Sequence, residues 1–176
     1  MSQHPVSFEA YPVDRFIDIV KAWIEHSWPI TAAEARQVYE SLGYSTVPED
    51  PEMFASPFAD GEADSYYVTV KGLVSTVDIA VARPCNAGEE EESSAAIASA
   101  YDAFCQAINS HYKNMISATR SEAGSTEWTF TSDVELDVSV WNRSISTCIH
   151  SPYMTQLRRE EQEMGLTSYD DILEDD

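Results

Sequence analysis

Residues 134–149 read VELDVSVWNRSISTCI, and no other stretch of this sequence has so regular a pattern. Apolar residues occupy every second position over 134–140, and Ile145, Thr147 and Ile149 continue the alternation over 145–149. Side chains of a strand point alternately to its two faces, so this period predicts two strands, each with one buried face. Asn142 and Arg143 interrupt the pattern where the chain must turn. The stretch therefore predicts an antiparallel β-hairpin.

A second hairpin is predicted around Gly72, because the two-residue period recurs over 66–71 and 77–82. One further short strand is predicted at 128–131. The segment 45–64 is rich in Pro, Asp and Glu, and we interpret it as a long surface loop with room for one short strand.

Four segments have helical periodicity instead. The first, 12–25, has apolar residues three and four positions apart on one stripe. The second begins at Thr31, which forms a capping-box pattern with Glu34, and ends before Gly43. The others are a long helix over 94–117 and a last helix over 152–164, in which Ser151 is the cap and Pro152 the first helical residue.

These elements predict an α+β fold in one domain over 1–176. We expect a single antiparallel sheet of about four to six strands, with two N-terminal helices, one long central helix and one C-terminal helix packed on one face. The arm 1–11 and the acidic tail 166–176 are expected to be flexible. The other face of the sheet would show the following residues to water or to a partner: Thr69, Lys71, Asp78, Glu135, Asp137 and Ser139.

The balance of charge restricts the possible partners. The chain has 31 acidic residues and 10 basic ones, a formal net charge of -21. Such a protein is repelled by nucleic acid and by anionic membranes, so we expect neither as a partner. We see no secretory signal at the N-terminus, and the three cysteines show no metal-like pairing. These features predict a cytoplasmic protein with free thiols.

Catalytic and metal-binding patterns are weak. Cys148 and His150 would lie on one face of a strand, but the sequence marks no third group to orient the histidine. The four histidines are scattered, which does not suit a zinc site. Asp60, Glu62 and Asp64 alternate as calcium ligands do, without the rest of a calcium loop. We therefore expect no catalytic residue, no bound metal and no cofactor.

What remains is an acidic surface with aromatic residues that we expect to be exposed, namely Tyr67 and Trp141. Aromatic side chains supply binding energy in protein interfaces, and complementary charge speeds association. The pattern predicts a basic protein partner, such as a nuclease or another enzyme with a cationic cleft. The candidate partner-binding residues are Asp60, Glu62, Asp64, Tyr67, Glu89, Glu90, Glu91, Glu135, Asp137 and Trp141.

Two stretches carry a resemblance to a known class of protein. Residues 28–43 join a Trp-Pro pair to a capped helix that ends at Leu42-Gly43, and residues 150–165 join His-Ser-Pro-Tyr to the last helix. Both resemble segments of small actinobacterial immunity proteins, which accompany secreted polymorphic toxins. The resemblance implies a cytoplasmic antitoxin that binds a cognate toxin domain and blocks its basic active site, with no catalytic residues of its own.

Two alternatives stay open. The order of helices and hairpins in a small acidic protein is also similar to the secretion-chaperone fold, whose members are usually dimers that hold an extended segment of an exported effector. An enzyme that binds a divalent metal through dispersed acidic residues is the other. A stable homodimer would favour the chaperone, and stabilisation by metal would favour the enzyme.

Overall fold

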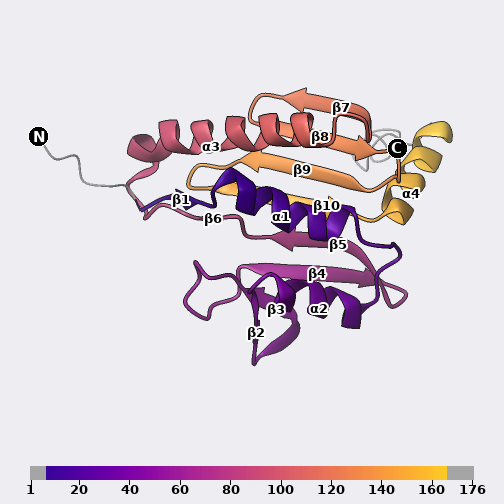
Figure 1. The fold of residues 1–176 in the computed structure, drawn as a ribbon, viewed down its shortest axis with the longest axis horizontal. Helices are drawn as coiled ribbons and strands as arrows, with labels where there is room; N and C mark the ends of the chain where they lie inside the picture. The colour runs from indigo at the N-terminus through magenta and orange to yellow at the C-terminus, as the bar shows by residue number, and fades with distance from the viewer. Residues whose placement is uncertain (1–6, 166–176) are drawn as a thin grey trace, which may run out of the picture.

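An eight-stranded antiparallel sheet organises residues 7–165, the part of the chain that this computed structural model describes (Figure 1). The strand order is β2-β3-β4-β5-β10-β9-β8-β7, and β1 and β6 form a separate two-stranded sheet. The strands are β1 (Glu9–Ala10), β2 (Ser45–Val47), β3 (Asp50–Ala55), β4 (Ser65–Val70), β5 (Leu73–Ile79), β6 (Ala82–Arg83), β7 (Ile116–Glu122), β8 (Ser125–Phe130), β9 (Glu135–Val140) and β10 (Ile145–His150).

The large sheet consists of two four-stranded meanders, β2–β5 and β7–β10, which meet where β5 pairs with β10. In that central ladder Cys148 lies opposite Asp78 on one side, and on the other side it lies opposite Asp137 of β9. Residues about 70 positions apart in the chain therefore become neighbours at the centre of the sheet.

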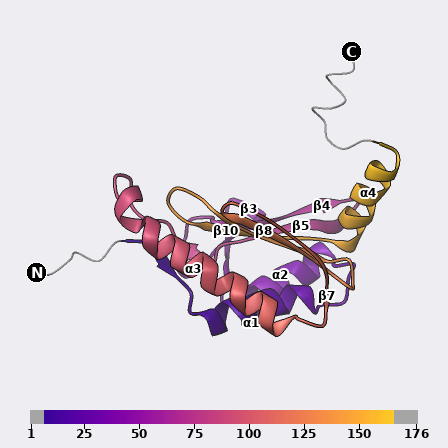
Figure 2. The same ribbon diagram turned by 90° about the horizontal axis from the view of Figure 1, so that it is seen from above.

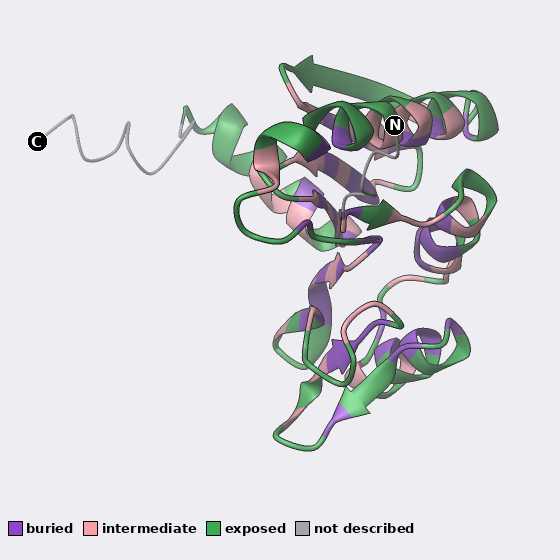
Figure 3. Cartoon of the chain, turned by 90° about the vertical axis from the view of Figure 1, so that its left-hand side faces the viewer, coloured by how far each residue is buried: buried purple, intermediate pink, exposed green. Residues whose placement is uncertain are grey.

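Three helices cover one face of the sheet (Figure 2). They are α1 (Val13–Ile24), α2 (Ala32–Ser41) and α3 (Glu90–His111). The core fills the space between these helices and the sheet, and buried residues line the inner sides of the elements (Figure 3). Phe16 of α1 stacks on Phe104 of α3 with ring centroids 3.9 Å apart. Tyr39 of α2 stacks in the same way on Phe54 of β3, at 4.2 Å.

Several predictions from local pattern are confirmed. Both hairpins form, as β4–β5 and β9–β10. The capping box between Thr31 and Glu34 is present, and Gly43 ends the helix with a φ of +88°. The Ser151 side chain caps α4 (Pro152–Glu163) by accepting a hydrogen bond from the Met154 amide. Among residues 7–165, no helix has the length and apolar character needed to cross a membrane.

The predicted number of strands was wrong, because the sheet has eight strands rather than four to six. The segment 45–64 contains β2 and β3, and the end of the predicted long helix is part of β7, since α3 stops at His111. Strands β2 and β7 are the two edges of the sheet. Edge strands accept exposed, charged and polar residues, so they lack the apolar alternation that reveals a half-buried strand.

The prediction that all helices share one face was also wrong. Helix α4 lies on the face opposite α1, α2 and α3, at one end of the sheet (Figure 2). Its Arg158 forms an ion pair with Glu135, whose side chain points away from the core. We call this second face the open face, because α4 covers only its end. The predicted acidic tail lies outside the described residues.

Candidate functional site

Two adjoining hollows lie at the end of the sheet that carries the β3–β4 loop and the β9–β10 turn. Both connections are at the left of Figure 1. Their volumes are about 410 and 360 Å³, and both are lined by Asp64 and Pro84. We call the two hollows together the acidic groove. Its lining includes Phe58, Asp60, Glu62, Asp64, Asp78, Pro84, Trp141, Arg143 and Ser146.

The β3–β4 loop places three carboxylates in this groove. Asp64 holds the loop in place, because its carboxylate accepts hydrogen bonds from the Ser56 amide at 2.8 Å and from the Ser56 hydroxyl. Asp60 has a φ of +48° and Gly61 a φ of +89°, so the tip of the loop turns through left-handed backbone. The turn leaves Asp60 and Glu62 exposed.

Trp141 forms part of the opposite wall. Its side chain is 63% exposed, yet its indole N–H donates a hydrogen bond of 2.7 Å to the Ser146 hydroxyl. The backbone of the turn is closed by the Trp141 amide, which donates to the Ser144 carbonyl. An exposed aromatic ring held in one orientation loses little freedom when a partner covers it, which suits a binding anchor.

Asp78 reaches the groove from β5. Burial raises the pKa of its carboxyl, a hydrogen bond from Tyr66 opposes that rise, and the neighbouring charge of Asp64 adds to it. Neither Asp64 nor Asp78 forms an ion pair with a basic side chain among residues 7–165. The groove lining has four acidic residues and one basic residue, Arg143, so the groove carries net negative charge.

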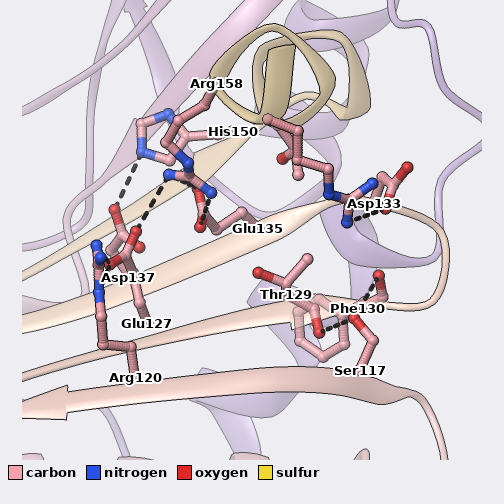
Figure 4. A network of polar contacts seen from close by, with 12 residues as sticks. Ser117, Arg120, Glu127, Thr129, Phe130, Asp133, Glu135, Asp137, His150 and Arg158 are labelled. Atoms are coloured by element: carbon pink, nitrogen blue, oxygen red, sulfur yellow. Dashed lines mark hydrogen bonds and ion pairs between the residues drawn. The ribbon is translucent and has the colours of Figure 1, made fainter. Parts of the chain in front are cut away.

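A second polar cluster lies on the open face beside α4 (Figure 4). Arg158 donates two hydrogen bonds to Glu135, one of them at 2.8 Å, and contacts Glu127 at 3.4 Å. Arg120 pairs with the same Glu127. Next to them, His150 Nε2 lies 3.0 Å from Asp137 Oδ2. We call this cluster the open-face network.

The open-face network contains donor types that hold metal ions. One ligand atom each of Glu135, Asp137 and His150 lies within 4.8 Å of the other two, and such donors suit zinc. In this structure, however, Arg158 already neutralises Glu135 and His150 is bonded to Asp137. The network is balanced by its own cations, so it gives less reason to expect a bound ion than the groove does.

Protonation follows from these contacts. Hydrogen bonding to Asp137, followed by a contact with Cys148, raises the pKa of His150 to about 10. The imidazole is therefore charged at neutral pH. Burial raises the pKa of the Glu135 carboxyl, and the Arg158 guanidinium opposes that effect. Asp137 is thus the orienting group for His150 that the sequence did not mark, and it is supplied by the neighbouring strand.

The structure brings together some of the predicted partner-binding residues and separates others. Asp60, Glu62, Asp64 and Trp141 meet in the acidic groove. Glu135 and Asp137 belong to the open-face network instead.

The predicted residues Glu89, Glu90 and Glu91 lie at the start of α3, outside the groove lining. Glu89 accepts hydrogen bonds from Ser7.

The prediction that Tyr67 is exposed was wrong. Tyr67 is 3% exposed, and its ring packs toward that of Phe54 on the side of the sheet that the helices cover. The exposed residues of that strand are Tyr66, Val68 and Val70. Alternation shows that the two sides of a strand differ, but it does not show which side is buried. In β4 the apolar side is exposed, while the side with Ser65 and Tyr67 is buried, so the prediction that the side of Thr69 faces outward was wrong.

The sequence analysis did not name Asp78 or Arg158 as site residues. Asp78 reaches the groove through the pairing of β5 with β10, and Arg158 reaches Glu135 through the position of α4.

Comparison with known proteins gives a family but no function. A model of the family DUF6301, described as a family of unknown function, matches residues 14–151. The match runs from α1 to the residue that caps α4 and includes the whole eight-stranded sheet. Neither the curated proteins nor the solved structures gave a match. The chain therefore belongs to the family of unknown function DUF6301.

Proposed function

We propose that this protein is an immunity protein, which binds a cognate secreted toxin domain and covers its basic active site. The observation that carries the proposal is the acidic groove. Three acidic loop residues and an exposed, oriented tryptophan, far apart in the sequence, line adjoining hollows. An exposed tryptophan can supply binding energy in an interface, and the acidic residues complement the charge of a basic protein surface.

The charges of the groove support binding to a cation. Carboxylates that are partly buried without a positive partner are costly, and a guanidinium or ammonium group from another protein would relieve that cost. The net charge of -21 acts over a longer range and draws a basic partner toward the protein. The open-face network, by contrast, holds its charges in internal pairs, so it is assigned a structural role.

A toxicity assay tests this function. The partner to use is the basic C-terminal domain of a secreted protein encoded next to this chain, expressed in bacteria with and without it. Expected results are growth arrest by the domain alone, rescue by co-expression, and a one-to-one complex by light scattering. The double variant Asp60→Lys/Glu62→Lys is expected to lose rescue, because it reverses two charges of the groove.

A matched control reverses the same number of charges elsewhere. Asp18 and Asp102 are exposed on α1 and α3, on the helical side of the molecule, and Asp18→Lys/Asp102→Lys is expected to rescue normally. Equal loss of rescue in both double variants would show an effect of net charge rather than of the groove. A stable homodimer that binds only unfolded effector would replace the proposal with the chaperone function.

A further inference from the structure

We propose that the hollow between Asp64, Asp78 and Trp141 receives an arginine side chain of the partner, with the guanidinium against the two carboxylates and stacked on the indole. This inference rests on the proposed function, since it names the chemical group that the acidic groove takes. It concerns the smaller hollow, of about 360 Å³, which is far larger than the roughly 30 Å³ that a water molecule occupies in the liquid.

The acidic side of the hollow comes from two strands. Asp64 directly precedes β4 and Asp78 lies near the end of β5, so a paired section of the sheet holds both. Asp64 has its hydrogen bonds to Ser56 but no cation, and Asp78 is half-buried with no cation in the described chain. A single group with several donors can serve both carboxylates, and a guanidinium has five N–H donors in a flat fork.

The aromatic side of the hollow favours arginine over lysine. Tryptophan is the best ring for cation–π contact, and a guanidinium also stacks flat on it, which an ammonium does not do. The bond to Ser146 fixes the Trp141 ring, so the stacking surface exists before the partner arrives. Lysine would gain the charge attraction alone.

Arg143 is the basic residue that lines the same hollow, and it does not take this place. Its Nε donates to the Cys85 carbonyl at 2.8 Å, and it forms no ion pair with a carboxylate of residues 7–165. The positive charge of Arg143 repels an incoming cation. The attraction of both carboxylates, Asp64 and Asp78, is therefore needed to outweigh that repulsion. Removing Arg143 is therefore expected to strengthen binding of a cationic probe.

The test uses the folded full chain and two small probes, N-acetyl-arginine amide and N-acetyl-lysine amide, followed by NMR. Arginine amide is expected to shift the Trp141 indole and Ser146 signals and to bind several-fold more tightly than lysine amide. The double variant Asp64→Asn/Asp78→Asn is expected to weaken arginine binding at least about tenfold. Loss of a hydrogen bond between charged groups generally lowers affinity by that factor or more. The control Asp18→Asn/Asp102→Asn removes the same charge from the helical side and is expected to bind like the wild type.

Three results would overturn the inference: equal affinity for both probes, no shift at Trp141, or equal weakening by the control. Trp141→Leu guards against misfolding of the aspartate variant, because residue 141 is on the surface and its loss should weaken arginine amide without unfolding the chain. Failure here with intact rescue by the toxin assay would leave the immunity function in place. Arginine binding without any toxin rescue would keep the hollow and remove that function.

Discussion

Arg158 of α4 and Glu135 of β9 form a two-pronged ion pair that fastens the last helix to the open face of the sheet. The carboxylate is almost fully buried, at 3% exposed, while the guanidinium side chain is 40% exposed. The contact is therefore a half-buried pair, and among residues 7–165 Arg158 is the one basic side chain that pairs with Glu135. Glu127 adds a second carboxylate at 3.4 Å.

Arg158→Met is expected to lower the free energy of unfolding by about 2 kcal/mol. Breaking a fully buried pair costs roughly 3–5 kcal/mol because a charge is left without a partner, and solvent at the exposed guanidinium reduces that figure. Urea denaturation of the two proteins measures the difference. Glu135→Gln combined with Arg158→Met is expected to recover part of the loss, since no buried charge then remains.

Arg159→Met is the matched control for that helix. Arg159 pairs with Asp133 on the surface, where ion pairs contribute little to stability. Its unfolding curve is expected to overlay that of the wild type. If both arginine variants lost the same stability, the effect would come from the helix and not from the buried carboxylate.

His150→Gln is expected to reduce stability at neutral pH and to have less effect in alkali. The folded pKa of about 10 lies above the roughly 6.5 of an unfolded histidine, so the folded state binds this proton more tightly. That stabilisation is complete below about pH 6.5 and is lost as the pH rises toward 10. We expect a difference of about 1–2 kcal/mol at pH 6, measured by urea denaturation at several pH values. A difference that stays constant up to pH 10 would contradict the assignment.

Tyr67→Ala and Trp141→Ala are expected to behave in opposite ways. The first removes a buried ring from the core and should cost about 3 kcal/mol of unfolding free energy. The second removes an exposed ring and should change stability by less than about 0.5 kcal/mol, while weakening the complex with the toxin domain. Denaturation and calorimetric titration of each variant separate the two roles.

Association with the toxin domain is expected to slow as salt rises. Electrostatic steering depends on charges that salt screens within about 10 Å at 0.1 M. Stopped-flow measurements between 50 and 500 mM salt should show a fall in the association rate of about tenfold, with a smaller change in dissociation. A rate that does not respond to salt would remove steering by the net charge of -21 from the mechanism.

The sequence predicted correctly those features of the structure that depend on a few neighbouring residues. Helix ends follow from neighbouring residues, so Thr31, Glu34 and Gly43 marked the limits of α2 correctly. A half-buried strand shows an alternation of apolar and polar residues, and β9 and β10 were found in this way. Edge strands β2 and β7 have no such alternation and were missed.

The site was predicted in part. Acidic loop residues and a turn tryptophan were recognisable as surface residues, because loops of charged residues and turns lie in solvent. Their meeting in one groove was not, since Asp64 and Trp141 are neighbours only through the pairing of β4, β5, β10 and β9. The same pairing sets Asp137 beside His150, which the sequence separates by a hairpin.

By itself, the sequence determined an acidic α+β chain with its capped helices and its two apolar hairpins, because composition, caps and periods act over a few residues. Only the tertiary structure decided that the sheet has eight strands, that α4 crosses to the open face, and that Tyr67 is buried. These choices depend on which surfaces lose water together and which charges find partners, and both are properties of the packed chain rather than of any segment.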